Sequence, residues 1–384
     1  MNKILVLTDN NPNKAARPFR LINLLCNIDS YETHVLSNTA FESDKVKHYK
    51  LQKKMTNWEG FIYMLSLYRF FSKFLCLNPV SNQVLDELKS NDYDLIICEN
   101  LTVIHLAFLI KSEKTKIMLD LREFYVNQYS DEFHGHFIKK YYYDSKIKYL
   151  NYLITEFASK CDKLITVSPG LQDNYKSTFN LDTDLIMSLP DYSENKSKPL
   201  NSGEKIKIVH HGGAKESRKI ELMIELMDYL DDRYELDLYL IKYHSSYYEE
   251  LKRLAKKSGK VNIYKEIELE KINDTLVNYD IGLIIFEPTT FNLEYSLPNK
   301  LFEFVQAGLL LVSYPLPNIK SIIHNYKVGL VSDNYNLKEI AKLLNSLTNE
   351  DINNYKLNSQ KASKDLNIEQ NNIKLKKIIN ELIN

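Results

Sequence analysis

The sequence SLPNKLFEFVQAG at residues 296–308, followed directly by LLLVS at 309–313, decides how this chain can fold. A Pro-Asn pair can begin a helix, apolar residues continue at helical spacing, and a glycine can end it before a run typical of a strand. Lys300 and Glu303 are three residues apart and therefore lie on one side of this helix, near its N-terminus. Backbone N–H groups and the helix dipole favour an anion there. The stretch predicts a helix–strand unit that presents a cation and a carboxylate to an anion such as a nucleotide diphosphate.

Short aliphatic runs alternate with longer amphipathic stretches along the whole chain, which is the pattern of βα units with a parallel sheet. The expected strands of the first half are Ile4–Leu7, Thr33–Leu36, Leu95–Cys98, Lys116–Leu119, Leu164–Val167 and Leu185–Leu189. Those of the second half are Lys207–His210, Leu236–Ile241, Val261–Tyr264, Ile281–Phe286, Leu309–Ser313 and Val328–Val331. The predicted class is α/β, with two doubly wound, Rossmann-like domains.

A chain of 384 residues is too long for one ordinary core and suits two domains. The polar segment 191–204 interrupts the strand–helix pattern and has the composition of a linker. We therefore expect an N-terminal domain over 1–190, a C-terminal domain over 205–365 and a charged helix over 366–384. Because open parallel sheets bind ligands beyond the carboxyl ends of their strands, two such domains facing each other would form one cleft.

The segment 298–308 resembles the PNKxFEYxxxG signature in the C-terminal domain of family 4-like glycosyltransferases of the GT-B fold. The resemblance implies that Glu303 holds the ribose of a nucleotide sugar and that Lys300 lies near its phosphates. It also implies a donor-binding second domain, an acceptor-binding first domain, retained anomeric configuration, and a terminal helix that crosses back to the first domain. The other donor-binding residues expected in this segment are Ser296, Pro298, Asn299 and Leu301.

A glycine pair, Gly212-Gly213, follows the first expected strand of the second domain and precedes a helix start. Such a turn lets the backbone approach a phosphate closely, and Arg218 and Lys219 at the helix entrance could pair with its charge. The resemblance places the family's phosphate-binding loop here, although the commonest version has an arginine where Gly213 stands. A glycine pair alone would favour an ordinary βα turn, but together with the helix at 298–308 it favours a phosphate site.

The histidines His210 and His211 stand directly before the glycines, where one could contact the donor or be a buried supporting residue. Family members often carry a second Glu eight residues before the helix Glu, but here that position is Tyr295. Glu294 is one residue off and Glu287 is further away. The carboxylate that would act on the sugar is thus unassigned; Glu294 could substitute or be a solvated surface residue.

In the first half, Asp120, Arg122 and Glu123 follow an apolar strand. They resemble the family's strand-end Asp-x-His-Glu, with Arg122 in place of the His. An arginine cannot act as a base at physiological pH, so we expect it to stabilise a phosphate or bind an anionic substrate, while Glu123 could orient sugar hydroxyls. A structural cluster that ties loops together is the alternative. Arg17 and Arg20, after the first strand, are further candidates for a phosphate contact by resemblance.

Composition and short motifs limit the other possibilities. Lys plus Arg and Asp plus Glu number 50 each, so no overall field draws nucleic acid. The scattered Cys26, Cys76, Cys98 and Cys161 indicate reduced thiols. The Asp182-Thr183-Asp184 sequence looks like a metal motif, but it lies in a loop near the linker, and no metal is expected. Ser168, after the strand at 164–167, resembles the family's Val-Ser turn and supports the fold more than catalysis.

The apolar segments of the sequence bear on where the protein is located in the cell. The first apolar run is too short for a signal peptide, and no segment reaches the ~18 apolar residues of a membrane span. We expect a cytoplasmic protein, with attachment at the inner face of the membrane left open. Two aromatic and basic stretches, 61–75 and 136–150, could rest on an anionic membrane or face a lipid-linked acceptor, although core helices look similar.

Together these features predict a glycosyltransferase that moves a sugar from a UDP- or GDP-sugar to a glycan or lipid-linked acceptor, in bacterial surface polysaccharide or glycoconjugate synthesis. No further cofactor is expected. Arg218, Lys219 and Lys300 would stabilise the leaving diphosphate. The main alternative is a non-catalytic GT-B-like subunit that binds a partner glycosyltransferase or a glycan, which Tyr295 and Arg122 motivate. A nucleotide-sugar epimerase is less favoured, because the carboxylate-rich site of such enzymes is missing.

Overall fold

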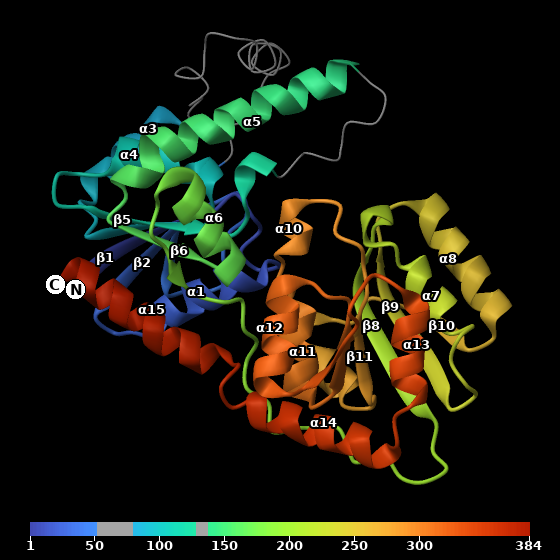
Figure 1. The fold of residues 1–384 in the computed structure, drawn as a ribbon. Coiled ribbons are helices and arrows are strands. Elements are labelled where there is room, and N and C mark those ends of the chain that lie inside the picture. Colours follow the sequence, from blue (N-terminus) through green and yellow to red (C-terminus); the bar gives the residue numbers. More distant parts are fainter. Residues whose placement is uncertain (52–79, 128–136) are drawn as a thin grey trace. The chain divides into compact units, whose positions relative to one another are not determined.

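The computed structural model describes residues 1–51, 80–127 and 137–384 (Figure 1). The chain divides into two compact units. The first comprises Met1–Ile186, Thr290–Asn292 and Asn372–Asn384, and the second comprises Met187–Thr289 and Leu293–Asn371. Each unit is built on a parallel sheet with helices on both faces.

The sheet of the first unit has the strand order β3-β2-β1-β4-β5-β6-β7, and all of its pairs are parallel. Its strands are β1 (Asn2–Leu7), β2 (Tyr31–Ser37), β3 (Val46–Lys50), β4 (Leu95–Cys98), β5 (Lys116–Leu121), β6 (Lys163–Thr166) and β7 (Asp184–Leu185). Side chains of β1 alternate between the two faces of the sheet, with Ile4 and Val6 in one apolar cluster and Leu5 and Leu7 in the other. Both faces are buried, which explains the uninterrupted aliphatic run.

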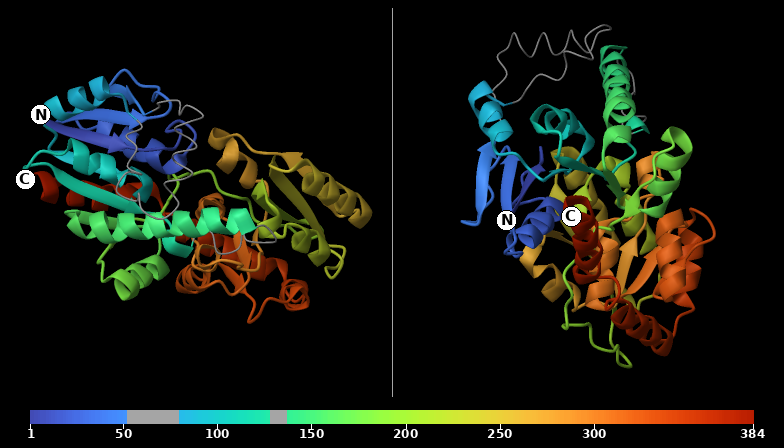
Figure 2. Two further views of the ribbon diagram at one scale, coloured as in Figure 1. Left: turned by 90° about the horizontal axis from the view of Figure 1, so that it is seen from above. Right: turned by 90° about the vertical axis from the view of Figure 1, so that its left-hand side faces the viewer.

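Helices cover both faces of this sheet (Figure 2). One face packs against α1 (Ala16–Cys26) and residues 372–383 of α15 (Ile368–Ile383). The other packs against α3 (Asn82–Ser90), α4 (Ile104–Ile110), α5 (Phe137–Phe157) and α6 (Pro169–Phe179). Short 3-10 turns are η1 (Leu101–Val103), η2 (Tyr125–Asn127) and η3 (Ala158–Lys160). The Ser168 hydroxyl caps α6 by accepting from the Leu171 amide at 3.4 Å, so it starts a helix, as a serine at this position commonly does.

The sheet of the second unit has the order β10-β9-β8-β11-β12-β13, again all parallel. Its strands are β8 (Ile206–Ala214), β9 (Tyr234–Lys242), β10 (Val261–Lys265), β11 (Ile281–Ile284), β12 (Leu310–Ser313) and β13 (Gly329–Val331). Its helices and turns are η4 (Glu216–Arg218), α7 (Glu221–Leu226), α8 (Ser245–Ser258), η5 (Leu269–Lys271), α9 (Ile272–Leu276), α11 (Asn299–Ala307), α12 (Pro317–Tyr326), α13 (Leu337–Asn345) and α14 (Asn349–Ala362). The short helix α10 (Phe291–Glu294) is divided between the two units.

The predicted helix at 298–308 is α11, and it packs closely on the sheet. Pro298 is its N-cap and Gly308, at φ +74°, is its C-cap. Gly282 of β11 leaves room for α11, because a Cβ there would lie 2.3 Å from the Phe304 ring. The close contact fixes α11 against the sheet, and with it the two charged residues that the helix carries.

Three expectations about elements need correction. The strand β3 was not predicted, because Val46–Lys50 is a partly exposed edge strand whose lysines and histidine hide the pattern. The strand expected over Leu185–Leu189 ends at Leu185. The strand expected over Lys207–His210 continues to Ala214, because its last residues keep pairing with β9. The glycine pair therefore lies in the end of β8 and not in a turn.

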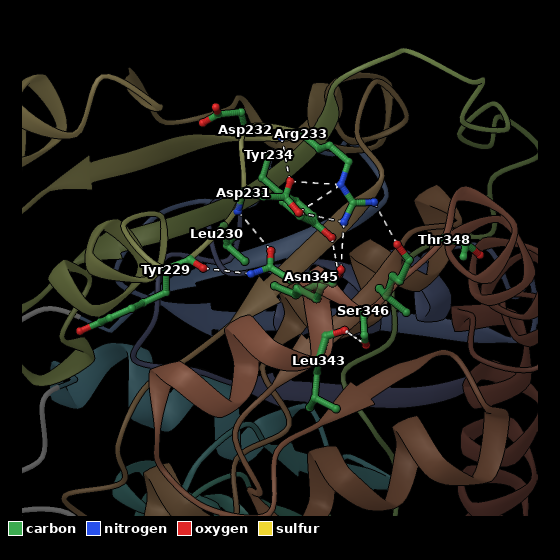
Figure 3. A network of polar contacts seen from close by, with 12 residues as sticks. Tyr229, Leu230, Asp231, Asp232, Arg233, Tyr234, Leu343, Asn345, Ser346 and Thr348 are labelled. Carbon is green, nitrogen blue, oxygen red and sulfur yellow. Dashed lines mark hydrogen bonds and ion pairs between the residues drawn. The ribbon is translucent and has the colours of Figure 1, made fainter.

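A polar network ties the start of β9 to the end of α13 (Figure 3). The Arg233 guanidinium donates to the Leu347 and Asn345 carbonyls at 3.0 and 3.1 Å. The Asn345 side chain donates to the Tyr229 carbonyl at 3.0 Å and accepts from the Asp231 amide at 3.2 Å. Asn345 thereby pairs two backbone groups of the loop before β9, the Tyr229 carbonyl and the Asp231 amide, which lie outside any strand ladder.

Some sequence-based predictions fall wholly or partly outside the residues that the structure describes. The aromatic stretch 61–75 and Cys76 lie outside the described residues, while most of the stretch 136–150 belongs to α5. Among the other cysteines, Cys98 is buried, and Cys26 and Cys161 are partly buried free thiols. No helix in the described ranges is long and apolar enough to cross a membrane.

Candidate functional site

The second unit contains a cavity of about 210 Å³ at the carboxyl ends of β8 and β11. Five residues that the sequence predicted for donor binding line it: Gly212, Gly213, Arg218, Pro298 and Lys300. They come from two segments of the chain, 212–218 and 298–300, which the parallel sheet brings to one edge.

Lys300 projects from the first turn of α11 and is held by His210. The Lys300 ammonium lies 3.0 Å from His210 Nε2, and His210 Nδ1 lies 2.8 Å from the Leu283 carbonyl. Because a carbonyl only accepts, Nδ1 carries the proton and Nε2 accepts from the ammonium. Burial lowers the pKa of His210 well below its usual value, so the imidazole stays neutral and orients the lysine.

The charge of Lys300 is not compensated by a carboxylate. Burial and then the charge of Arg218 lower the pKa of Lys300 to about 7, although Glu303 opposes this shift. Arg218 is partly buried, and the resulting desolvation lowers the pKa of its guanidinium, which lies 5.1 Å from the centre of the Phe286 ring. Across the described part of the chain, neither cation forms an ion pair. The cavity therefore holds two desolvated positive charges that an anion would satisfy.

The two glycines make room for this arrangement. Gly212 has φ +136°, which L side chains rarely adopt, and a Cβ there would lie 2.9 Å from the Lys300 ammonium. A Cβ on Gly213 would lie 2.7 Å from the ring of Tyr243, which also lines the cavity. The glycines thus allow the backbone to approach a cation and an aromatic ring, although they belong to a strand.

Lys219 is placed differently from the prediction. It does not line the cavity, and its ammonium forms an ion pair with Glu287, the distant carboxylate noted before α11. Its backbone adopts the left-handed conformation at φ +44° and ψ +53°. Its charge is therefore already balanced within the protein.

Glu303 is buried on α11 next to His211. Its Oε2 atom lies 3.1 Å from His211 Nε2, but the angle makes no hydrogen bond, and the His211 ring packs edge-on against Phe304. Glu303 does not line the 210 Å³ cavity. Its carboxylate is about one turn of helix from Lys300 and lies beside the His211 imidazole, which is only 13% exposed and whose Nε2 atom is buried without a hydrogen-bond partner among the described residues.

The remaining predicted donor residues have structural contacts. The Ser296 hydroxyl donates to the Leu293 carbonyl at 2.8 Å, Leu301 is in the core, and Asn299 is exposed at the start of α11. The Tyr295 carbonyl accepts from Asn318 at 2.6 Å, and Glu294 ends α10. None of these residues lines the cavity.

A second cavity, of about 410 Å³, lies at the carboxyl ends of β1, β4 and β5 in the first unit. Arg122 and Glu123, which the sequence predicted as ligand-binding residues at this strand end, line it. Arg17 is engaged elsewhere, because its guanidinium grips both oxygens of Asp120 at 2.5 and 3.1 Å. Arg20 lies on α1. The predicted phosphate contact of Arg17 thus competes with a two-pronged ion pair.

The two aspartates of the metal-like sequence each pair with a lysine of the same unit. Asp182 lies 2.8 Å from Lys176, and Asp184 lies 2.5 Å from Lys163. Within the described ranges, no group of three or more His, Cys, Asp or Glu residues could hold a metal ion.

Sequence reasoning missed Tyr243 and left the role of His210 open. Tyr243 follows β9, and the register of β8 with β9 pairs Gly213 with Ile241, two residues earlier. A large residue just past a strand end, beside a glycine of the neighbouring strand, is the signal that could have found it. The contact of His210 with Lys300 joins residues 90 positions apart and leaves no local pattern.

No protein-family model matches this chain, and no curated protein matches it. Solved structures match over nearly its whole length. HepE from Anabaena, in complex with UDP-glucose, has a TM-score of 0.71 at 13% identity, covering 99% of each chain. Sucrose-phosphate synthase from Thermosynechococcus elongatus has a TM-score of 0.73 at 10% identity, covering 100% of this chain and 99% of the synthase.

A mutant of S. aureus TarM, in complex with Fondaparinux, alpha-GlcNAc-glycerol and UDP, has a TM-score of 0.67 at 9% identity and covers 100% of both chains. These neighbours are GT-B glycosyltransferases. The chain has the GT-B fold. The predicted fold class, with two parallel-sheet α/β domains, is confirmed.

Proposed function

We propose that this protein is a glycosyltransferase that takes a sugar from a nucleotide-diphosphate donor, with the diphosphate bound in the 210 Å³ cavity of the second unit. One observation carries the proposal: the Lys300 ammonium, aimed by a neutral His210, shares the cavity with Arg218 and meets no carboxylate among the described residues. Burying such a charge is costly unless a ligand pairs with it. A diphosphate supplies the missing negative charge.

The chemistry follows from the position of the two cations. When the bond between sugar and diphosphate breaks, negative charge grows on the diphosphate oxygens. Lys300 and Arg218 would stabilise this charge, each charge-assisted hydrogen bond contributing roughly 1.5–3 kcal/mol. The His210 contact fixes the ammonium in advance, so little reorganisation is needed during the reaction. Lys219 plays no part in this step as long as Glu287 holds it.

Several finer features of the proposal come from the family resemblance. Glu303 would hold the ribose, the anomeric configuration would be retained, and no metal would be needed. UDP-glucose in HepE and UDP in TarM favour a UDP-sugar as the first donor to test. Fondaparinux in TarM favours a glycan as the acceptor. A lipid-linked acceptor at the inner face of the membrane, in surface polysaccharide synthesis, belongs to the same proposal.

Thermal unfolding with nucleotides tests the proposal. A ligand at 100 times its Kd stabilises the native state by about 2.7 kcal/mol, so UDP or GDP should raise the Tm while uridine should not. Lys300→Met should abolish the nucleotide shift. Lys256→Met is the matched control, because Lys256 is an exposed residue of α8 in the same unit. A panel in which no nucleoside diphosphate raises the Tm would refute diphosphate binding.

Tyr295, at a position where relatives often have a glutamate, supports a second candidate, a GT-B-like subunit without catalysis. Release of UDP from UDP-sugars distinguishes the glycosyltransferase from the non-catalytic subunit. A nucleotide-dependent Tm shift, without release of UDP from any UDP-sugar in the presence of glycan acceptors, would favour the subunit.

A further inference from the structure

The 410 Å³ cavity of the first unit exposes an arginine with unused hydrogen-bonding capacity. The Arg122 side chain lines this cavity and is only 20% exposed. Its nearest recorded charge partner is Glu99, but NH1 lies 3.8 Å from Glu99 Oε2, which is beyond hydrogen-bonding distance. Within the described residues, the guanidinium donates no hydrogen bond. A guanidinium that is largely shielded from water and donates to no described residue is costly without a ligand.

Glu99 shows the same deficiency from the other side. It stands at the end of β4 with 2% of its side chain exposed, and its Oε2 atom has no hydrogen-bond partner. The pair thus attracts across 3.8 Å without the hydrogen bonds that normally offset the desolvation of two buried charges. Glu99 therefore balances the charge of Arg122 at a distance, without the hydrogen bonds of a close ion pair.

The other carboxylates near Arg122 are already engaged. Both oxygens of Asp120 are held by Arg17. Asp9 accepts a hydrogen bond from the Asn100 amide and one from the Thr102 hydroxyl at 2.6 Å. Both carboxylates thus have other partners, and neither accepts a hydrogen bond from Arg122 among the described contacts. The planar N–H groups of Arg122 match the two oxygens of a carboxylate or phosphate.

We propose that the cavity beside Arg122 binds an oxyanion, carboxylate or phosphate, and that Glu99 is the internal counter-ion that Arg122 gives up when this ligand binds. Taken with the proposed function, the oxyanion belongs to the acceptor, which makes the acceptor an acidic sugar or a phosphorylated one. The anion site itself depends only on contacts within the first unit.

The charges around the pair predict how binding depends on pH. The cavity lining holds Arg122 and Lys146 as cations and Asp9 and Glu123 as carboxylates, so it has no excess of positive charge. The net charge around Arg122 therefore depends on whether Glu99 is ionised. Burial and then Asp120 raise the pKa of Glu99 to about 7, while Arg122 and Arg17 oppose the shift. The groups facing Arg122 are Glu99, Asp120, Tyr125 and Asp9.

A bound anion would raise the pKa of Glu99 further, so binding is accompanied by uptake of a proton. Affinity should therefore be greatest below pH 7, where Glu99 is already neutral, and should fall as the pH rises through 7. A Glu99→Gln substitution imitates the neutral form. It should tighten anion binding several-fold at pH 8 and remove most of the pH dependence.

Titration of the full chain with small probes tests the proposal. Methyl β-D-glucuronide carries a carboxylate where methyl β-D-glucoside carries a hydroxymethyl group, so the pair tests whether the site prefers a carboxylate. Inorganic phosphate tests whether the site binds a phosphate group. The Lys300→Met background removes the ammonium of the second unit and so weakens phosphate binding there, and the comparison with Arg122→Gln assigns what remains to the first unit. We expect the glucuronide or phosphate to bind at least tenfold more tightly than the glucoside at pH 6. Arg122→Gln should remove this difference, whereas Arg253→Gln, on the exposed side of α8, should keep it.

Equal binding of the glucuronide, phosphate and glucoside would overturn the proposal, as would an anion preference that survives in Arg122→Gln. Weaker anion binding in Glu99→Gln would overturn the counter-ion role and does not depend on how Arg122→Gln folds. A preference for glucuronide supports an acidic sugar, and a preference for phosphate supports a phosphorylated acceptor. Failure of the nucleotide Tm shift, together with Arg122-dependent anion binding, would refute the proposed function and leave this site standing.

Discussion

Replacing Lys300 by methionine should make the ligand-free protein more stable at pH 7. The pKa of Lys300 is about 7 in the folded protein and 10.5 in the unfolded chain. Holding the residue in the fold therefore costs at most about 4 kcal/mol at pH 7, because 3.5 pKa units correspond to roughly 5 kcal/mol and half of Lys300 is already neutral. Methionine leaves His210 Nε2 without its donor, which costs about 2 kcal/mol.

The balance is a gain of about 2 kcal/mol, or a rise in Tm of roughly 4–8 °C. The sign of the pH dependence follows from the lowered pKa. The unfolded chain binds more protons than the folded protein between pH 7 and 10.5, so wild-type stability rises over this window relative to Lys300→Met. At pH 9 the penalty is about 2 kcal/mol, and the advantage of the variant should vanish.

Urea unfolding at pH 7 and pH 9 measures the difference, with Lys256→Met as the control that should match wild type at both values. A Lys300→Met protein that is less stable than wild type at pH 7, or whose advantage does not change between the two pH values, would refute the reasoning. Either result would mean that the ammonium is well solvated or paired, so that it has no unmet need for an anion.

Three further substitutions separate the cavity from its surroundings. Gly212→Ala should weaken UDP binding at least tenfold in a calorimetric titration, because the new methyl would lie 2.9 Å from the Lys300 ammonium at φ +136°; unchanged affinity would show that the close approach is not needed. Lys219→Gly should keep the Kd for UDP within about twofold, since Lys219 pairs with Glu287 outside the cavity; a tenfold loss would restore it as a phosphate ligand. Asn345→Ala should lower the Tm by roughly 2–4 °C by leaving backbone groups unpaired, about 1 kcal/mol, with the UDP shift unchanged; a lost UDP shift would contradict its purely structural role.

The fold was predictable because both faces of each sheet are buried. Central strands such as Leu95–Cys98 and Ile281–Ile284 are then continuous aliphatic runs, which are visible without any knowledge of the partners. The edge strand Val46–Lys50 lacks this signal, because lysines and a histidine interrupt its apolar residues, and it was missed. The length of β8 was underestimated because its last residues, which include two glycines, are held by pairing with β9 and not by their own propensity.

The residue types of the candidate site were predictable from the sequence, but only some of the contacts between them were. Lys300, Arg218 and the glycine pair follow from local sequence, since a helix start and close backbone approach have recognisable residues. The support from His210 depends on strand register, which one sequence does not reveal. The pairing of Lys219 with Glu287 and its left-handed backbone are tertiary features that local sequence does not reveal.

The proton balance of UDP binding tests the central role of Lys300 most directly. Calorimetric titration of UDP at pH 8, in two buffers that differ in ionisation enthalpy, measures the protons taken up per UDP bound. With a pKa of about 7, roughly ten in eleven Lys300 side chains are neutral at pH 8 and must be protonated to pair with a diphosphate, so about 0.9 proton should be taken up. Binding of UDP with no proton uptake would contradict the claim that a desolvated Lys300 waits for an anion.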